Sequence, residues 1–74
     1  MKRETIVIDL AIDAAELLRL YRGFVRTVIA RSRDGRWVQF PAHVLRAHVA
    51  PHGVQGAFAL RVEDGRLTTL ERLD

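Results

Sequence analysis

Two Asp-Gly pairs, at positions 34–35 and 64–65, constrain the fold of this chain more than any other feature. Asp-Gly favours a two-residue type I′ turn, because both residues of such a turn need positive φ angles. The apolar and β-branched runs beside each pair have the composition of strands. The sequence therefore predicts two β-hairpins, with strands at 24–32 and 36–40 and at 56–63 and 66–73.

A further strand is predicted near the N-terminus, at 4–12. Its apolar residues recur at every second position, which is the period of a half-buried strand. The residues expected on its inner face are Ile6, Ile8, Leu10 and Ile12.

A helix is predicted directly after this strand, at 13–22. Asp13 is suited to cap it, and Glu16 follows three residues later in a pattern typical of a capping box. The apolar residues after the cap follow a helical stripe. We expect the helix to bury the side chains of Leu17, Leu18 and Tyr21 against the sheet.

Proline and glycine residues predict where the remaining strands and helices end. Pro41 ends the strand at 36–40 and begins a short helix, which Pro51 and Gly53 interrupt. At 74 residues the chain has room for one domain, 1–74. The element order predicts an α+β fold, strand-helix-strand-strand-(short helix)-strand-strand. In it a bent antiparallel sheet or small open barrel packs on one main helix.

Charge is distributed unevenly along the chain. Twelve basic residues and nine acidic residues give a net charge of +3. The segment 17–61 holds eight arginines and one carboxylate, Asp34, whereas both ends of the chain are net acidic. Arginine is suited to bidentate contacts with phosphate or carboxylate, so the asymmetry points to an anionic partner. A GC-rich genome explains the same arginine content without any function.

The sequence has few residues that are suited to catalysis or metal binding. There is no cysteine, which excludes disulfides and thiolate metal sites. The histidines are His43, His48 and His52; only the last two have a helical ligand spacing, and Pro51 separates them. The only serine, Ser32, has no histidine close to it in sequence. We therefore expect no enzyme activity, no metal and no cofactor, in a soluble cytoplasmic protein without a membrane segment.

Three blocks of sequence are distinctive: Tyr21-Arg22-Gly23, Asp34-Gly35-Arg36 and Val38-Gln39-Phe40-Pro41-Ala42. With these blocks the chain resembles a family of short bacterial proteins catalogued as a domain of unknown function. The resemblance covers nearly the whole chain. It implies a stand-alone protein, and it brings no activity and no catalytic residue with it.

A second resemblance is partial. Arg22 and Arg26 match the Arg-x-x-x-Arg half of the PilZ motif, which binds cyclic-di-GMP. The other half is incomplete, because Ala30 stands where that motif has Asp or Asn. The resemblance implies a nucleotide site at these two arginines.

The predicted two-residue turn at 34–35 fixes the pairing of its strands. Arg33 then faces Arg36, whereas the turn at 64–65 pairs Glu63 with Arg66. Opposed like charges destabilise a hairpin, so an arginine tip of this kind is a candidate anion site. Replacing Arg33 with glutamate is then expected to preserve or raise stability. Two alternatives stay open: a longer loop separates the arginines, or Asp34 bridges them.

The same pairing assigns the faces of the first hairpin. Trp37 shares one face with Arg26, Val28 and Gln39, whereas Ile29, Val38 and Phe40 lie on the other. Since those three residues compete to face the helix, we expect Trp37 to be partly exposed, as a stacking or protein-contact surface. If the helix covers it instead, it belongs to the core.

These features favour a non-enzymatic module that binds RNA or DNA, with arginines on the phosphates and a tryptophan near for stacking. The candidate site residues are Arg26, Arg31, Arg33, Arg36 and Trp37. The alternative is a protein–protein interaction or homo-oligomeric structural module, in which Trp37 and flanking apolar residues contact a second copy or another protein.

Overall fold

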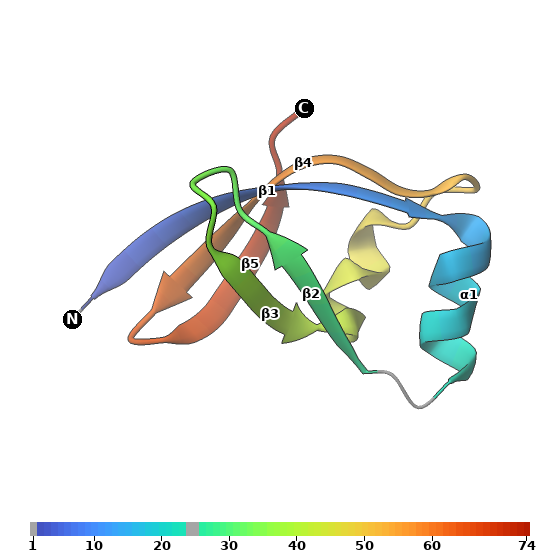
Figure 1. Cartoon of the computed structure of the whole chain (residues 1–74), viewed down its shortest axis with the longest axis horizontal. Coiled ribbons are helices and arrows are strands. Elements are labelled where there is room, and N and C mark those ends of the chain that lie inside the picture. Colours follow the sequence, from blue (N-terminus) through green and yellow to red (C-terminus); the bar gives the residue numbers. More distant parts are fainter. Residues whose placement is uncertain (1, 24–25) are drawn as a thin grey trace.

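The computed structural model describes residues 2–23 and 26–74, apart from the side chain of Tyr21. The described elements follow the predicted order (Figure 1). They are β1 (Arg3–Asp13), α1 (Ala14–Arg22), β2 (Thr27–Arg31), β3 (Trp37–Pro41), the 3-10 helix η1 (Ala42–His48), β4 (Gly53–Glu63) and β5 (Arg66–Arg72). None of the helices in this part of the chain is long and apolar enough to cross a membrane.

The described strands form two antiparallel sheets, and they do not close into a barrel. β1 pairs with β4 along its whole length, from Arg3 opposite Glu63 to Asp13 opposite Gly53, and β4 pairs in turn with β5. β2 and β3 form a separate two-stranded sheet that crosses the first one (Figure 1).

The second predicted hairpin, β4–β5, is confirmed. Glu63 pairs with Arg66 across a two-residue turn. Asp64 and Gly65 have φ angles of 50° and 80°, as a type I′ turn requires.

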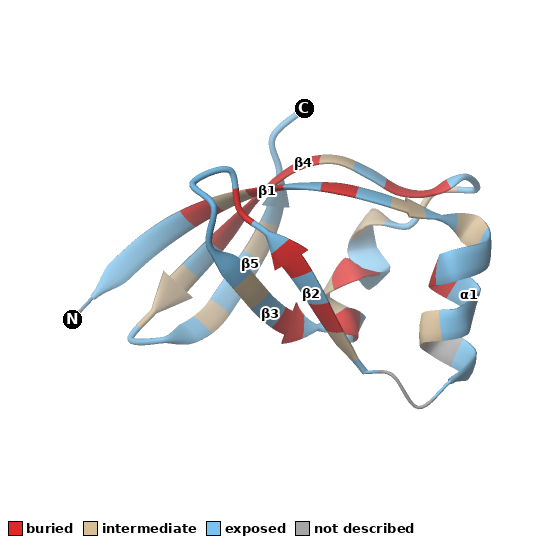
Figure 2. Ribbon diagram, viewed as in Figure 1, coloured by how far each residue is buried: buried red, intermediate tan, exposed pale blue. Residues whose placement is uncertain are grey.

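The core lies between the two sheets, and η1 contributes to it through Leu45. The predicted inner face of β1 is confirmed, because Ile6, Ile8 and Leu10 are buried and Ile12 is partly buried (Figure 2). Each large apolar side chain removed from water in this way stabilises the fold by about 1.5–3 kcal/mol. The largest fully buried side chains are Phe58, Ile8, Leu45 and Val54.

Helix α1 begins as predicted but buries less than predicted. The Glu16 N–H donates to the Asp13 carboxylate at 2.8 Å, which caps the first turn. Leu17 is buried, whereas Leu18 is 51% exposed, so the predicted burial of Leu18 is wrong. The side chain of Tyr21 lies outside the described residues.

The predicted α+β fold packed on one main helix is also wrong. The protein is mostly antiparallel sheet, and β2–β3 covers the face that was assigned to the helix. The reason is geometric. The nine residues of α1 follow β1 without a loop and are held at its end. Nine helical residues span only about 13 Å, which is too short to cover the sheet.

Candidate functional site

The loop of the β2–β3 hairpin is longer than predicted. Arg31 pairs with Trp37 and Ile29 with Gln39, one position away from the predicted register. The Ser32 N–H donates to the Arg36 carbonyl at 2.8 Å, so Ser32 and Arg36 close a loop of three residues. The prediction that Arg33 faces Arg36 is therefore wrong.

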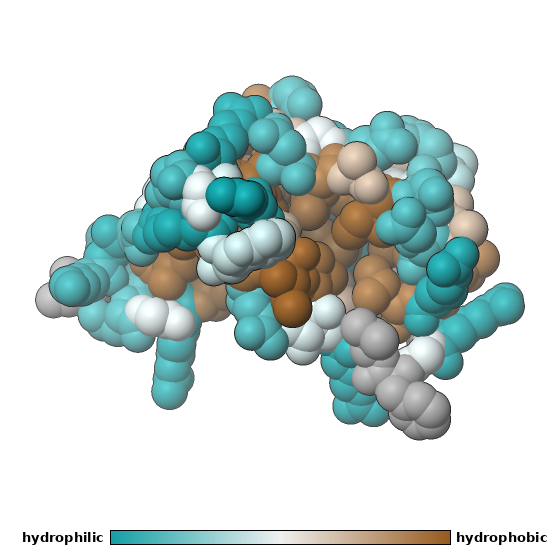
Figure 3. All heavy atoms as spheres, viewed as in Figure 1, coloured by the Kyte–Doolittle hydropathy of each residue, from teal (hydrophilic) through white to brown (hydrophobic). Residues whose placement is uncertain are grey.

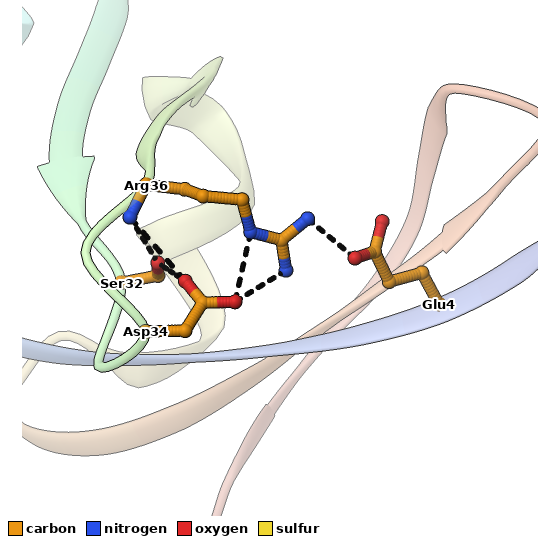
Figure 4. Close-up of polar contacts among 4 residues, drawn as sticks. All are labelled: Glu4, Ser32, Asp34 and Arg36. Carbon is orange, nitrogen blue, oxygen red and sulfur yellow. Dashed lines mark hydrogen bonds and ion pairs between the residues drawn. The ribbon is translucent and has the colours of Figure 1, made fainter.

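Side chains of the loop explain this register. Ser32 is a buried residue. Its hydroxyl donates to the Asp34 carboxylate and accepts the Arg36 N–H, the latter at 3.0 Å (Figure 4). Gly35 supplies the positive φ angle, 90°, that ends a three-residue hairpin loop. These short-range bonds fix the loop more specifically than the Asp-Gly pair alone.

Arg36 lies between two carboxylates. Its guanidinium donates to Asp34, with both Nε and Nη2 at 2.8 Å from Oδ2, and its Nη1 donates to Glu4 of β1 (Figure 4). The hydrogen bonds from Arg36 and then from Ser32 lower the pKa of Asp34 to about 2. The bonds to Asp34 and Glu4 raise the pKa of Arg36.

Arg33 is paired as well. Its Nε and Nη2 donate to the two carboxylate oxygens of Asp9 at 2.9 and 2.7 Å, a bidentate contact. This contact lowers the pKa of Asp9 and raises the pKa of Arg33. We call these charged residues the loop clamp, because they join the β2–β3 loop to β1. Its members are Glu4, Asp9, Arg33, Asp34 and Arg36.

The loop clamp engages Arg33 and Arg36, the two arginines that the sequence predicts as an anion site. Of the two alternatives left open by the sequence, the longer loop is confirmed. Asp34 does not bridge the two arginines, because it binds Arg36 whereas Arg33 binds Asp9. The guanidinium groups of Arg33 and Arg36 face carboxylates of their own chain. An external anion would have to compete with those carboxylates for the same donors.

Trp37 is exposed, as predicted, but beside other residues of β2 than predicted. A shift of one residue in register exchanges the two faces of a strand. Trp37 therefore lies beside Ile29 and Arg31, and Arg26 belongs to the alternate set of positions. The exposed fraction is 70% for Trp37 and 65% for Ile29. The Arg31 guanidinium carbon lies 5.6 Å from the centre of the indole ring, which is a cation–π contact.

An apolar groove opens beside this face, between α1, β2 and the second half of β1. Its volume is about 390 Å³. Figure 3 shows apolar residues gathered in this hollow between the hairpin and the helix. We call it the α1–β2 groove, and its lining residues are Leu10, Ile12, Glu16, Arg19, Leu20, Thr27, Val28 and Ile29.

The sequence does not predict this groove. The helix residues expected to be buried do not include Leu20, although it lies three positions after Leu17 and is half-buried. The predicted register places Ile29 on the inner face, whereas the observed register places it on the outer one. The spacing of Leu17 and Leu20 was the available signal.

The histidines do not gather into a site in the described part of the chain. His48 lies within 3.1 Å of the Leu70 carbonyl through Nε2, and its ring stacks edge-on against Phe58 at 5.1 Å. His43 and His52 are exposed. Among the described residues no three His, Asp or Glu side chains lie close enough to hold a metal ion. The absence of a bound metal stays a prediction.

The partial PilZ resemblance is not tested by this geometry. Arg22 and Arg26 are both exposed. The segment between them includes residues 24–25, which lie outside the described residues.

The family described as "Protein of unknown function (DUF2835)" matches residues 4–73. No curated protein and no solved structure matches the chain.

Proposed function

The chain belongs to this family of proteins of unknown function, and from its surface we propose that it is a non-enzymatic protein-binding module. The observation that carries the proposal is an indole ring that is 70% exposed beside an isoleucine that is 65% exposed. The isoleucine, Ile29, also lines the α1–β2 groove. Exposed apolar surface of this kind marks interaction sites, and Trp and Arg are the residues enriched at binding hot spots.

The surroundings of Trp37 support a protein partner over a polyanion. Two of the arginines predicted to bind phosphate, Arg33 and Arg36, are engaged in the loop clamp. Arg26 belongs to the set of β2 positions that alternates with Ile29 and Arg31. Arg31 is then the one cation of the predicted set that lies beside the indole.

Single-stranded nucleic acid is the second candidate, and the contact between Arg31 and Trp37 favours it. An exposed indole with a guanidinium beside it can stack a base and bind the adjacent phosphate. Such binding has a steep salt dependence, because phosphate contacts release counterions. A homodimer through the Trp37 face is the remaining form of the protein-binding proposal.

The experiment is affinity capture from a lysate of the source organism, with wild-type protein, Trp37→Ala and Leu73→Ala. Leu73 is 53% exposed and lies on the C-terminal segment, which bonds to β4, so it is the matched control. We expect Trp37→Ala to lose the captured protein while its melting temperature stays close to wild type, because the indole is exposed. Truncation of a tryptophan hot spot costs about 2 kcal/mol of binding or more.

Nuclease treatment and a sizing measurement separate the alternatives. Capture that survives nuclease and depends on Trp37 supports the protein-binding module, and concentration-dependent dimerisation that depends on Trp37 supports its homodimeric form. Capture that nuclease abolishes supports the second candidate. Equal capture by all three proteins contradicts a role for the Trp37 face.

A further inference from the structure

The edge of β2 that faces the α1–β2 groove has unpaired backbone groups. The Ala42 N–H donates to the Arg26 carbonyl at 2.8 Å, so the backbone groups of Arg26 point toward β3. Backbone groups alternate between the two sides of a strand along an antiparallel pair. The N–H and C=O groups of Thr27 and Ile29 therefore point away from β3, toward the groove.

β1 does not pair with this part of β2. The two strands meet near the hairpin loop, where Ile8 and Ser32 form an isolated bridge. From there they diverge toward α1, and the groove opens between them (Figure 1). Over residues 2–23 and 26–74, strand pairing leaves Thr27 and Ile29 without a partner on the groove side.

The groove has the lining that an added strand requires. A strand presents alternate side chains to opposite faces, so one laid along β2 turns every second side chain into the groove. Leu10, Ile12 and Leu20 would meet those side chains. A volume of about 390 Å³ lies in the range of side-chain and small-ligand pockets.

The charges around the groove favour an added strand that carries acidic side chains. Arg19 lies on the groove wall, and Arg31 follows Ile29 on β2. Neither arginine forms a salt bridge within the described residues, and the one carboxylate in the groove lining is that of Glu16.

We infer that the α1–β2 groove binds a short, extended segment of a partner protein that adds a strand to the free edge of β2. Its alternate apolar side chains fill the groove, and its acidic side chains lie near Arg19 and Arg31. This inference rests on the proposed function, because it specifies the partner for the same surface.

The first test uses a defined probe, the N-acetylated and C-amidated peptide Asp-Val-Thr-Leu-Thr-Val-Glu. It is titrated into the isotope-labelled full chain and followed by NMR. We expect the largest amide shifts at Thr27, Ile29 and Arg31. At saturation, hydrogen exchange of the Ile29 amide should slow by about tenfold or more, because that N–H becomes hydrogen-bonded.

Two N-methylated forms of the peptide are matched controls. Methyl groups on the nitrogens that face β2 remove the donors of the added strand, whereas methyl groups on the alternate nitrogens leave them in place. We expect only the first form to lose binding. A peptide with lysines in place of its acidic residues should bind several-fold more weakly.

A variant of the protein tests the same backbone hydrogen bonding by removing the N–H donor of Ile29 on β2. Ile29→Pro removes the groove-facing N–H without removing a bond to β3, and proline is tolerated at such edge positions. Ile29→Ala keeps the N–H and is its control. We expect the proline variant to lose the peptide and the alanine variant to retain most of the binding.

The outcomes separate this inference from the proposed function. Equal binding of both methylated peptides overturns strand addition but leaves a protein-binding groove. Failure of the parent peptide to shift any groove amide overturns the inference, while the capture experiment still decides the proposed function. An oligothymidylate that slows exchange at Ile29 where the peptide does not overturns it in favour of nucleic acid.

Discussion

Arg33 and Arg36 direct their donors to carboxylates of their own chain. Arg33 binds Asp9 through two N–H groups, and Arg36 binds Asp34 and Glu4. All of these side chains are substantially exposed, and exposed ion pairs are screened by water and salt. Their effect is therefore to orient the loop against β1 more than to supply a large stabilisation.

Acid is expected to weaken the loop clamp through Asp34. Its folded-state pKa is depressed from 3.8 to about 2, chiefly by the hydrogen bonds from Arg36. A depressed carboxyl pKa stabilises the fold at pH values above the unfolded pKa, and the contribution is lost as the pH falls through the folded pKa. The stability of the wild type should thus decline between about pH 4 and pH 2, with part of the decline absent in Asp34→Asn.

The measurement is a series of urea melts across this pH range, together with NMR titration of the Asp34 carboxyl carbon. A midpoint for Asp34 at its ordinary value would contradict the pairing with Arg36. So would an identical decline in stability for wild type and Asp34→Asn.

Individual elements differ in how much of their structure was predictable from sequence. β1 and the cap of α1 were predicted because their signals are local: an alternating pattern and one side-chain bond. The β4–β5 hairpin was predicted for the same reason. The β2–β3 hairpin was not, because Ser32 and Asp34 bond to their own loop and lengthen it by one residue. Serine and aspartate in a turn are known to compete in this way, which was the missed signal.

The β2–β3 register differs from the predicted one by one residue, and this difference affects the whole candidate site. It exchanged the two faces of β2 relative to β3, so that Ile29 is exposed and Val28 is buried, the reverse of the prediction. The groove also depends on the distance between α1 and β2, which no local pattern encodes. This part of the site could be obtained only from the three-dimensional arrangement.

The unequal burial of two neighbouring leucines in α1 gives a prediction for that element. Leu17 is 6% exposed and Leu18 is 51% exposed. Leu17→Ala should destabilise the protein by about 2–5 kcal/mol, as large-to-small changes in a core do. Leu18→Ala should change stability by less than about 1 kcal/mol, because it leaves no cavity. Chemical denaturation of the two variants measures this difference, and equal losses would show that the helix is rotated.

For the molecule as a whole, folding cancels part of the charge asymmetry along the sequence. Glu4 and Asp9, from the acidic N-terminal part, pair with arginines of the basic middle segment. The charge gradient along the sequence predicts an anionic partner, yet part of that gradient is neutralised within the chain. The surface that we propose for a partner is the Trp37 face with the α1–β2 groove, where Trp37, Ile29 and most of the groove lining are apolar.

The central claim is that the loop arginines pair with carboxylates of their own chain and orient the β2–β3 loop against β1. The substitution Arg33→Glu tests it most directly. If Arg33 faced Arg36 without a partner, the substitution would preserve or raise the melting temperature. In the structure, it places a glutamate against Asp9 and removes a bidentate contact.

We therefore predict that Arg33→Glu lowers the melting temperature, and that adding Asp9→Arg restores part of the loss by reversing the pair. The measurement is thermal melting of wild type, Arg33→Glu, Asp9→Arg and the double variant at neutral pH and low salt. The predicted result is a double variant more stable than either single variant. A melting temperature of Arg33→Glu equal to or above wild type, with no rescue in the double variant, would contradict the account and return the arginine tip to the candidates for anion binding.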